Sequence, residues 1–243
     1  MRRLARGLLG ALILAQVGYS RLPDRHLTAA TRSIVGLMLA ASVADAVAAR
    51  GLRRGAGAVT AAGALGFGAE LVGVATGRPF GHYHYGPGLG PGVRGVPLLA
   101  AAAWAMMARP AWVVAGLIAR RPAARVPLAA GALTAWDVYL DPRMARDGFW
   151  TWPGGGRYEG VPLSNFAGWF AVGLPVFAVW AVIDGDDDPE RDGDGALALY
   201  TWTWLGEGFA QLVLWRRPVV AAAGGLAMGA FAAPALWHRS RRP

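Results

Sequence analysis

Hydrophobic stretches recur along almost the whole chain and are separated by short polar breaks. Each stretch is close to the ~20 residues that a helix needs to cross the hydrocarbon core of a bilayer. We predict membrane spans at residues 4–19, 33–49, 56–75, 95–118, 126–140, 166–183, 196–214 and 219–237. The pattern therefore predicts an all-α integral membrane protein, a single bundle of about eight transmembrane helices, with seven as the alternative count.

The connections between these stretches are too short for a second, soluble domain, and no internal repeat stands out. We therefore expect residues 1–243 to form one transmembrane domain, in a multi-pass protein of the cell membrane. The fourth stretch contains Arg109 and Pro110. Because proline removes a helical hydrogen bond, we expect this span to be kinked or divided into two half-spans.

Composition removes several classes of function. The chain has 24 basic and 15 acidic residues and a net charge of +9, but the basic residues are spread through the polar breaks, which argues against nucleic-acid binding. The absence of cysteine excludes disulfides, thiolate metal sites and a cysteine nucleophile. There is also no dinucleotide fingerprint, P-loop or HExxH pair. These absences point to a cofactor-free reaction on a lipid-soluble substrate.

The most informative carboxyl groups are Asp137 and Asp141, in the segment AWDVYLDP. Residues four apart share one face of a helix. Pro142 disfavours helical geometry at Asp141, so we expect the helix to stop there. Two carboxyl groups close together in a low dielectric do not both ionise easily, and the one that keeps its proton is suited to act as a general acid. The structural alternative is that Asp137 bonds across the bundle and Asp141 caps a turn.

Three other acidic residues lie within predicted spans, where charge is costly. Asp45 is near the end of its span, so we expect its side chain to reach the membrane interface. Glu70 and Glu207 are each expected either to face the same cavity as Asp137 or to form an interhelical hydrogen bond.

Two connections, residues 76–94 and 141–164, are rich in glycine, proline and aromatic residues. Such aromatic side chains suit the membrane interface or the roof of an apolar cavity. His82 and His84 alternate with tyrosines in the first connection. Alternate histidines can converge on a metal ion, but the other two histidines have no ligand spacing, so we predict a polar wall or lid and no metal site.

The segment 184–194 contains seven acids among eleven residues, and its simplest interpretation is a solvated loop. A rival interpretation is a magnesium diphosphate site, as in a membrane prenyltransferase or lycopene elongase. Its candidate ligands would be Asp184, Asp186, Asp187, Asp188 and Asp192. They form one cluster, whereas membrane prenyltransferases of this kind carry two spaced acidic motifs.

Three segments in order carry a family resemblance: TGRPFGHYHYGPGLGPGVRGVP, AWAMMARPAW and TAWDVYLDPRMARDGFWTWPGGGRYEGVPLSNFAGW. Together they resemble the membrane-embedded hydratases of carotenoid biosynthesis, the family of the bisanhydrobacterioruberin and γ-carotene hydratases. The resemblance is strongest over residues 70–183. WDxxLDP followed by W-x-W and NFxGW is specific in combination.

The resemblance implies addition of water to the terminal double bond of an acyclic carotenoid end, of the C50 bisanhydrobacterioruberin type or the γ-carotene type, to give a tertiary alcohol. We predict that Asp137 or Asp141 supplies the proton, with Glu70 as a third catalytic candidate. The other carboxylate, or His82 or His84, would orient the water. We expect no cofactor, and as partners a lipid-soluble carotenoid, membrane lipids and other enzymes of the carotenoid pathway.

Protonation of the alkene creates a tertiary cation, which electron-rich aromatic faces stabilise. The candidate substrate-binding residues are His82, Tyr83, His84, Tyr85, Trp136, Trp150, Trp152, Tyr158, Asn165 and Trp169. Of these, Trp136, Trp150, Trp152 and Tyr158 are expected to wall the cation. If the loop is extended, we expect only one of the rings of Trp150 and Trp152 to point inward. A non-enzymatic alternative is a carotenoid-binding or transport protein, in which Glu70, Asp137 and Glu207 relay protons or fix helices.

Overall fold

The computed structural model describes residues 1–185 and 193–241. This part of the chain contains eight α-helices, and each coincides with one of the predicted stretches. They are α1 (Arg2–Tyr19), α2 (Asp24–Gly51), α3 (Gly57–Thr76), α4 (Leu98–Ile118), α5 (Pro122–Arg146), α6 (Leu163–Asp184), α7 (Asp194–Phe209) and α8 (Pro218–Ser240). A π-helical turn, Leu52–Ala56, joins α2 to α3, and a second, Ala210–Leu214, extends α7. The predicted all-α fold is confirmed.

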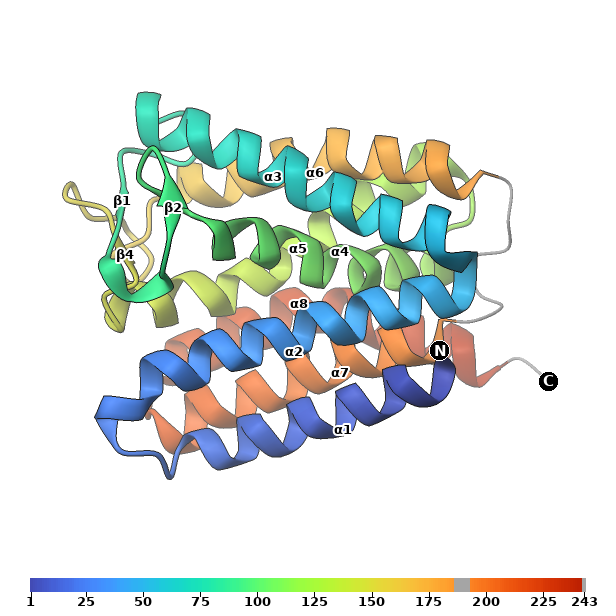
Figure 1. The fold of residues 1–243 in the computed structure, drawn as a ribbon, viewed down its shortest axis with the longest axis horizontal. Helices are drawn as coiled ribbons and strands as arrows, with labels where there is room; N and C mark the ends of the chain where they lie inside the picture. Colours follow the sequence, from blue (N-terminus) through green and yellow to red (C-terminus); the bar gives the residue numbers. More distant parts are fainter. Residues whose placement is uncertain (186–192, 242–243) are drawn as a thin grey trace.

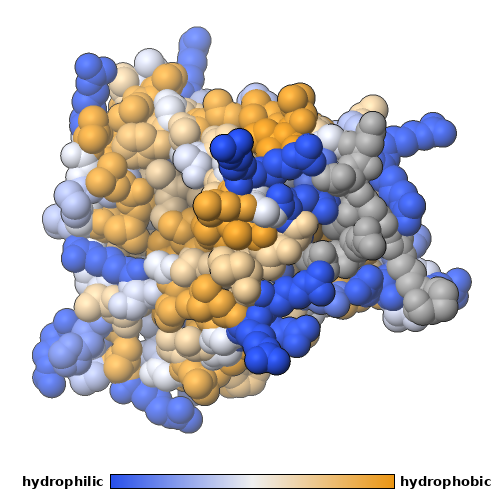
Figure 2. Space-filling view, turned by 45° about the vertical axis from the view of Figure 1, so that its right-hand side comes forward, coloured by the Kyte–Doolittle hydropathy of each residue, from blue (hydrophilic) through white to orange (hydrophobic). Residues whose placement is uncertain are grey.

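Four helical segments are long and apolar enough to cross a membrane: Asp24–Thr76, Leu98–Ile118, Leu163–Asp184 and Pro218–Ser240. Large apolar side chains are exposed on the surface, among them Leu14, Val182 and Leu226 at 74%, 83% and 76%. Figure 2 shows broad apolar areas on the visible face, interrupted by hydrophilic side chains. Exposed apolar surface of this extent suits contact with lipid. The chain is thus an all-α membrane protein, and membrane crossing by α1, α5 and α7 stays a prediction.

The helices run roughly along one axis, with α4 and α5 between the pair α3 and α6 and the remaining helices (Figure 1). Both termini lie at one end of the bundle. Helix α4 is the central element, because every residue from Trp104 to Leu117 is buried. It runs unbroken past Pro110, so the predicted division into two half-spans is wrong.

The two aromatic connections meet at the end of the bundle opposite the termini (Figure 1). Strand β1 (His84–Tyr85) pairs antiparallel with β4 (Trp150–Thr151), and Tyr85 lies opposite Trp150. Next to them, β2 (Gly92–Val93) pairs with β3 (Val96–Pro97), after a short 3-10 turn at Pro87–Leu89. The β1–β4 pair and its flanking loops are called the lid below.

The sequence predicts that helix α5 stops at Asp141. The helix instead continues through Pro142 to Arg146. Proline has no N–H, so the carbonyl of Val138 loses its helical donor. The hydroxyl of Tyr158 donates a hydrogen bond to that carbonyl at 3.0 Å instead. The lid connection therefore satisfies the backbone group that Pro142 frees, and Asp141 remains within the helix rather than capping a turn.

Asp45 is buried within the bundle, whereas the sequence predicts a side chain that reaches outward to the membrane interface. It is 8% exposed, and its Oδ2 accepts a hydrogen bond from Nε of Arg109 on α4 at 3.0 Å. The prediction is wrong because a buried arginine, whose position in an apolar helix itself requires a partner, lies within reach.

Asp184, at the end of α6, belongs to a buried ion-pair cluster. Its Oδ1 lies 2.5 Å from Nε of Arg50, and its Oδ2 lies 3.6 Å from Nη1 of Arg125. The indole nitrogen of Trp112 donates a further hydrogen bond to Oδ2 at 2.8 Å. Asp184 is therefore engaged within the bundle and is not part of a solvated loop. The other four residues of the rival magnesium site, Asp186, Asp187, Asp188 and Asp192, lie outside the described residues.

Candidate active site

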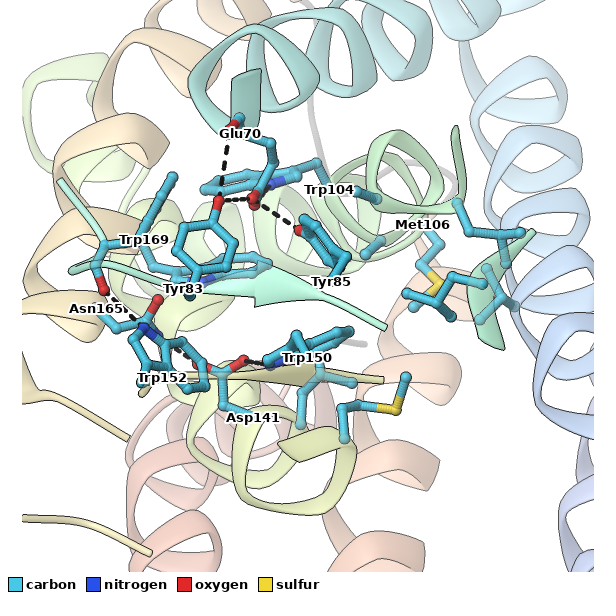
Figure 3. Close-up of a pocket in the computed structure, with 18 residues that line it drawn as sticks. Glu70, Tyr83, Tyr85, Trp104, Met106, Asp141, Trp150, Trp152, Asn165 and Trp169 are labelled. Carbon is cyan, nitrogen blue, oxygen red and sulfur yellow. Dashed lines mark hydrogen bonds between the residues drawn. The ribbon is translucent and has the colours of Figure 1, made fainter. Parts of the chain in front are cut away.

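A cavity lies between α3, α4, α5, α6 and the lid (Figure 3). Its polar lining residues are Glu70, Tyr83, Tyr85, Asp141 and Asn165, and its other walls are made of aromatic and aliphatic side chains. Its volume is about 50 Å³, which is enough for a few water molecules. A larger ligand could enter this space only by displacing lining side chains.

Glu70, on α3, forms the polar group on one side of this cavity. Its carboxyl accepts hydrogen bonds from the hydroxyls of Tyr83 and Tyr85, the latter at 2.8 Å, and from the indole nitrogen of Trp104 at 2.9 Å. The side chain is buried, with 4% exposure. A carboxylate only accepts hydrogen bonds, so these three donors match its ionised form. Glu70 thereby fastens the lid to α3 and α4.

The two tyrosines that bind Glu70 lie in the lid. Burial, followed by the nearby Glu70 carboxyl, raises the pKa of Tyr83 and of Tyr85 above the ordinary tyrosine value. Both hydroxyls therefore keep their protons at physiological pH and act as donors.

Asp137 and Asp141 come together on one face of α5, as their spacing predicts. The amide nitrogen of Asn165, on α6, donates hydrogen bonds to Oδ2 of Asp137 at 2.9 Å and to Oδ2 of Asp141. The indole nitrogen of Trp150 donates to Oδ1 of Asp141 at 3.0 Å. Asp141 lines the cavity, whereas Asp137 is fully buried in the wall behind it.

The second oxygen of the Asp137 carboxyl, Oδ1, is buried and has no hydrogen-bond partner among the described residues. A buried polar atom without a partner costs free energy unless water or a proton satisfies it. Asp137 also makes the interhelical bond, to Asn165, that the structural alternative expects. The bond and a chemical role are compatible, because Asn165 couples this carboxyl to the one that faces the cavity.

Aromatic rings enclose the space between the two carboxyl sites (Figure 3). Trp104 and Trp169 stack with centroids 4.0 Å apart and planes within 10°. The ring of Tyr83 lies 5.9 Å from that of Trp152. Both Trp150 and Trp152 line the cavity, so the expectation that only one ring points inward is wrong. Residues two apart in an extended segment lie on the same face, which explains why both do.

Glycine on α3 makes room for this aromatic packing. A Cβ added at Gly73 would lie 2.7 Å from Cδ2 of Phe80 and 2.8 Å from the hydroxyl of Tyr83. Only a residue without a side chain allows both rings to approach the helix here. The small residues around Glu70 in the sequence thus position the tyrosine that binds it.

Several candidate residues lie outside the cavity. His82 and His84 are exposed, and Nε2 of His84 lies 2.9 Å from Oγ1 of Thr151 on the neighbouring strand. Tyr158 packs edge-on against Phe166 with centroids 5.7 Å apart. In residues 1–185 and 193–241, no three His, Cys, Asp or Glu side chains come together in a way that could hold a metal ion.

Trp136 and Glu207 line a different cavity, between α1, α2, α5 and α7. Of the sequence candidates, the structure brings Glu70, Tyr83, Tyr85, Asp141, Trp150, Trp152, Asn165 and Trp169 to the first cavity. Sequence reasoning missed Trp104 and Phe80, which also line it. The position of Trp104 within AWAMMARPAW, one of the three resembling segments, was the available signal.

Comparison with known proteins shows which family the chain belongs to. No solved structure matches the chain. Over 126 residues the chain is 34% identical to a protein of Haloarcula japonica named bisanhydrobacterioruberin hydratase. That match spans 50% of this chain and 43% of the relative. A family model described as "Carotenoid biosynthesis protein" matches residues 28–231, which include every residue of the cavity. The resemblance seen in the loop motifs is thereby confirmed, and the chain belongs to this family of carotenoid biosynthesis proteins.

Proposed function

We propose that this chain is an enzyme of the cell membrane, crossing it several times, that adds water to the terminal double bond of an acyclic carotenoid end. The observation that carries the proposal is the Asp137–Asn165–Asp141 cluster, which opens through Asp141 into an aromatic cavity. The family membership and the name of the Haloarcula relative support the same chemistry. The product is a tertiary alcohol.

Asp141 is the proton donor in this proposal, because its carboxyl is the one of the pair that lines the cavity. No cationic side chain makes a hydrogen bond or ion pair with either carboxyl in the part of the chain that is described. Two uncompensated negative charges at such close range are costly, so the pair holds one proton. Asp137 acts as a positioning residue, because the amide of Asn165 binds both carboxyls and holds them together.

Proton transfer to the less substituted alkene carbon leaves a tertiary cation on the neighbouring carbon. The electron-rich indole rings of Trp104, Trp150 and Trp152 line the cavity. Cation–π contacts of this kind contribute ~2 kcal/mol or more in a desolvated site. The Glu70 carboxylate adds a negative charge on the opposite side, and its three hydrogen-bond donors keep it from removing a proton from the cation.

Water then attacks the cationic carbon, and the oxonium ion that results returns one proton to the carboxyl pair. One C–H bond and one C–O bond form, one O–H bond of water and the π bond are lost, and the acid is regenerated. No electrons are exchanged, so the reaction needs no cofactor. The cavity has room for the water molecule beside Asp141.

A C50 substrate of the bisanhydrobacterioruberin type is the first choice, because the Haloarcula relative is named for it. A carotenoid with a γ-carotene-type end is the second choice of substrate. Both are lipid-soluble and would reach the protein through the membrane. Other enzymes of the carotenoid pathway, which make and consume such compounds, are the expected protein partners.

Expression in a host that makes acyclic carotenoids, followed by mass analysis of the pigments, tests the proposal. We expect pigment heavier by one water, or by two if both ends react. A change in mass by an isoprenoid unit would instead indicate prenyl transfer. Unchanged pigment that copurifies with the protein would indicate a binding or transport protein.

A further inference from the structure

A second and larger cavity lies between α1, α2, α5 and α7, with a volume of about 410 Å³. This volume is within the range of small-molecule binding sites. It shares four lining residues with the active-site cavity, Val35, Met106, Leu140 and Met144. The two cavities therefore abut, and these four apolar side chains are the partition between them.

The partition is made of side chains that can move. Met106 and Met144 are unbranched and adapt to different shapes of their surroundings. Neither belongs to the hydrogen-bonded clusters around Glu70 and Asp141, and both are buried. A change of rotamer at these methionines would join the small cavity to the large one without disturbing the acid. This displacement would provide the room that a carotenoid end requires.

The rim of the large cavity carries apolar side chains that are exposed on the surface of the protein. Val17 on α1 and Phe209 on α7 line the cavity and are 50% and 59% exposed. Leu214, at the end of the π-helical turn, also lines it and is 45% exposed. Apolar residues that border a cavity and also face outward mark a passage for an apolar molecule from the bilayer.

We propose that the large cavity holds the apolar chain of the substrate, which passes from the bilayer between α1 and α7 and presents its terminal double bond to Asp141 past Met106 and Met144. The identity of the occupant rests on the proposed function. A carotenoid is long and apolar, and only its end must reach the acid, so the remainder needs an apolar channel continuous with the site. The large cavity adjoins the site at the shared partition, and its lining is mainly apolar, with Arg21, Arg143, Asp147 and Glu207 as the charged members.

Gly206 on α7 offers a direct test, because it lines the large cavity only. A Cβ at this position would lie 3.5 Å from Trp202, an ordinary contact, so Gly206→Leu adds bulk without a clash at Cβ. Gly68→Leu is the matched control: Gly68 is exposed on α3, and a Cβ there meets nothing within 4 Å. Both changes are made in an Asp141→Asn background, so that bound carotenoid is measured without a reaction.

The variants are purified from a host that makes acyclic carotenoid, and the pigment bound per protein is measured by absorbance. We expect at least a tenfold decrease for Gly206→Leu and no change for Gly68→Leu. Equal pigment in both, or no bound pigment in the Asp141→Asn parent at saturating carotenoid, would overturn the channel. If Gly206→Leu does not accumulate, Ala210→Leu, at another residue of the cavity wall, carries the test with the same outcomes.

A parallel preparation of the unmodified protein separates this proposal from the proposed function. Carotenoid that binds the unmodified protein through the channel but gains no water would remove the hydratase function and leave the channel in place. Water addition by the unmodified protein, together with pigment binding that is insensitive to Gly206→Leu, would support the hydratase function and remove the channel.

Discussion

The indole nitrogen of Trp150 lies 3.0 Å from Oδ1 of Asp141, so the lid donates a hydrogen bond directly to the carboxyl that faces the cavity. Trp150 also lies opposite Tyr85 in the β1–β4 pair, and the Tyr85 hydroxyl binds Glu70 at 2.8 Å. Two adjacent lid residues on paired strands thus contact the two carboxyl sites. The β1–β4 pair of the lid therefore contacts both carboxyl sites at once.

Trp150→Phe keeps an aromatic ring in the lid and deletes this hydrogen bond. Loss of a hydrogen bond to a carboxyl costs about 1.5 kcal/mol, so we expect roughly a tenfold lower hydration rate per protein. Trp237→Phe, at an exposed position on α8, is the control and should keep the parent rate. An unchanged rate in Trp150→Phe would show that the bond does not contribute to catalysis.

Asn165→Leu removes the amide that joins Asp137 to Asp141. We expect conversion to fall at least a hundredfold while carotenoid still binds, because the apolar walls and the channel are intact. Pigment mass and pigment bound per protein are measured on the same sample. Parallel loss of binding and conversion would instead assign Asn165 a purely structural role.

Gly73→Ala introduces a Cβ that crowds Phe80 and the hydroxyl of Tyr83. Overpacking of this kind costs about 1–3 kcal/mol, and here it should also displace Tyr83 from Glu70. Thermal unfolding in detergent and hydration rate should both decrease. Gly68→Ala, five residues earlier on the same helix and open to the surroundings, should leave both unchanged or slightly raise the unfolding temperature. Equal behaviour of the two variants would contradict the packing argument.

Asp184→Asn breaks the buried pairs with Arg50 and Arg125. Removal of one partner from a buried ion pair costs about 3–5 kcal/mol, so we expect a clear decrease in unfolding temperature. Asp194→Asn, which disrupts a solvent-exposed pair with Arg239, should have little effect. Hydration per folded molecule should be unchanged in both variants and insensitive to a magnesium chelator. Magnesium-dependent addition of an isoprenoid unit to the pigment would favour the prenyltransferase interpretation.

The sequence predicts the helices well, because each apolar stretch is long enough to identify a helix by itself. It also predicts that Asp137 and Asp141 meet, since a spacing of four residues is a local property of a helix. The pairing of Asp45 with Arg109 and of Asp184 with Arg50 could not be read in the same way. Each of these contacts joins two helices, and which helices are neighbours is decided only by the packing of the bundle.

Predictions from local sequence were wrong where a residue far along the chain makes a contact that the local sequence does not reveal. Pro142 is expected to end α5, but the hydroxyl of Tyr158, from the lid, donates a hydrogen bond to the carbonyl of Val138. Trp104 reads as one more apolar helical residue, yet its indole nitrogen binds Glu70 on the neighbouring helix. Both contacts depend on how the connections fold back over the bundle, which a single sequence does not encode locally.

The most direct test of the central claim follows the oxygen atom. Cells that express the protein or its Asp141→Asn variant are grown in water labelled with heavy oxygen, and the pigments are analysed by mass. We expect one labelled hydroxyl for each reacted end in the parent protein and no hydroxylated pigment in the variant, with both proteins accumulating equally in the membrane. A hydroxyl oxygen that comes from molecular oxygen, or full conversion by Asp141→Asn, would contradict acid-catalysed hydration at this site.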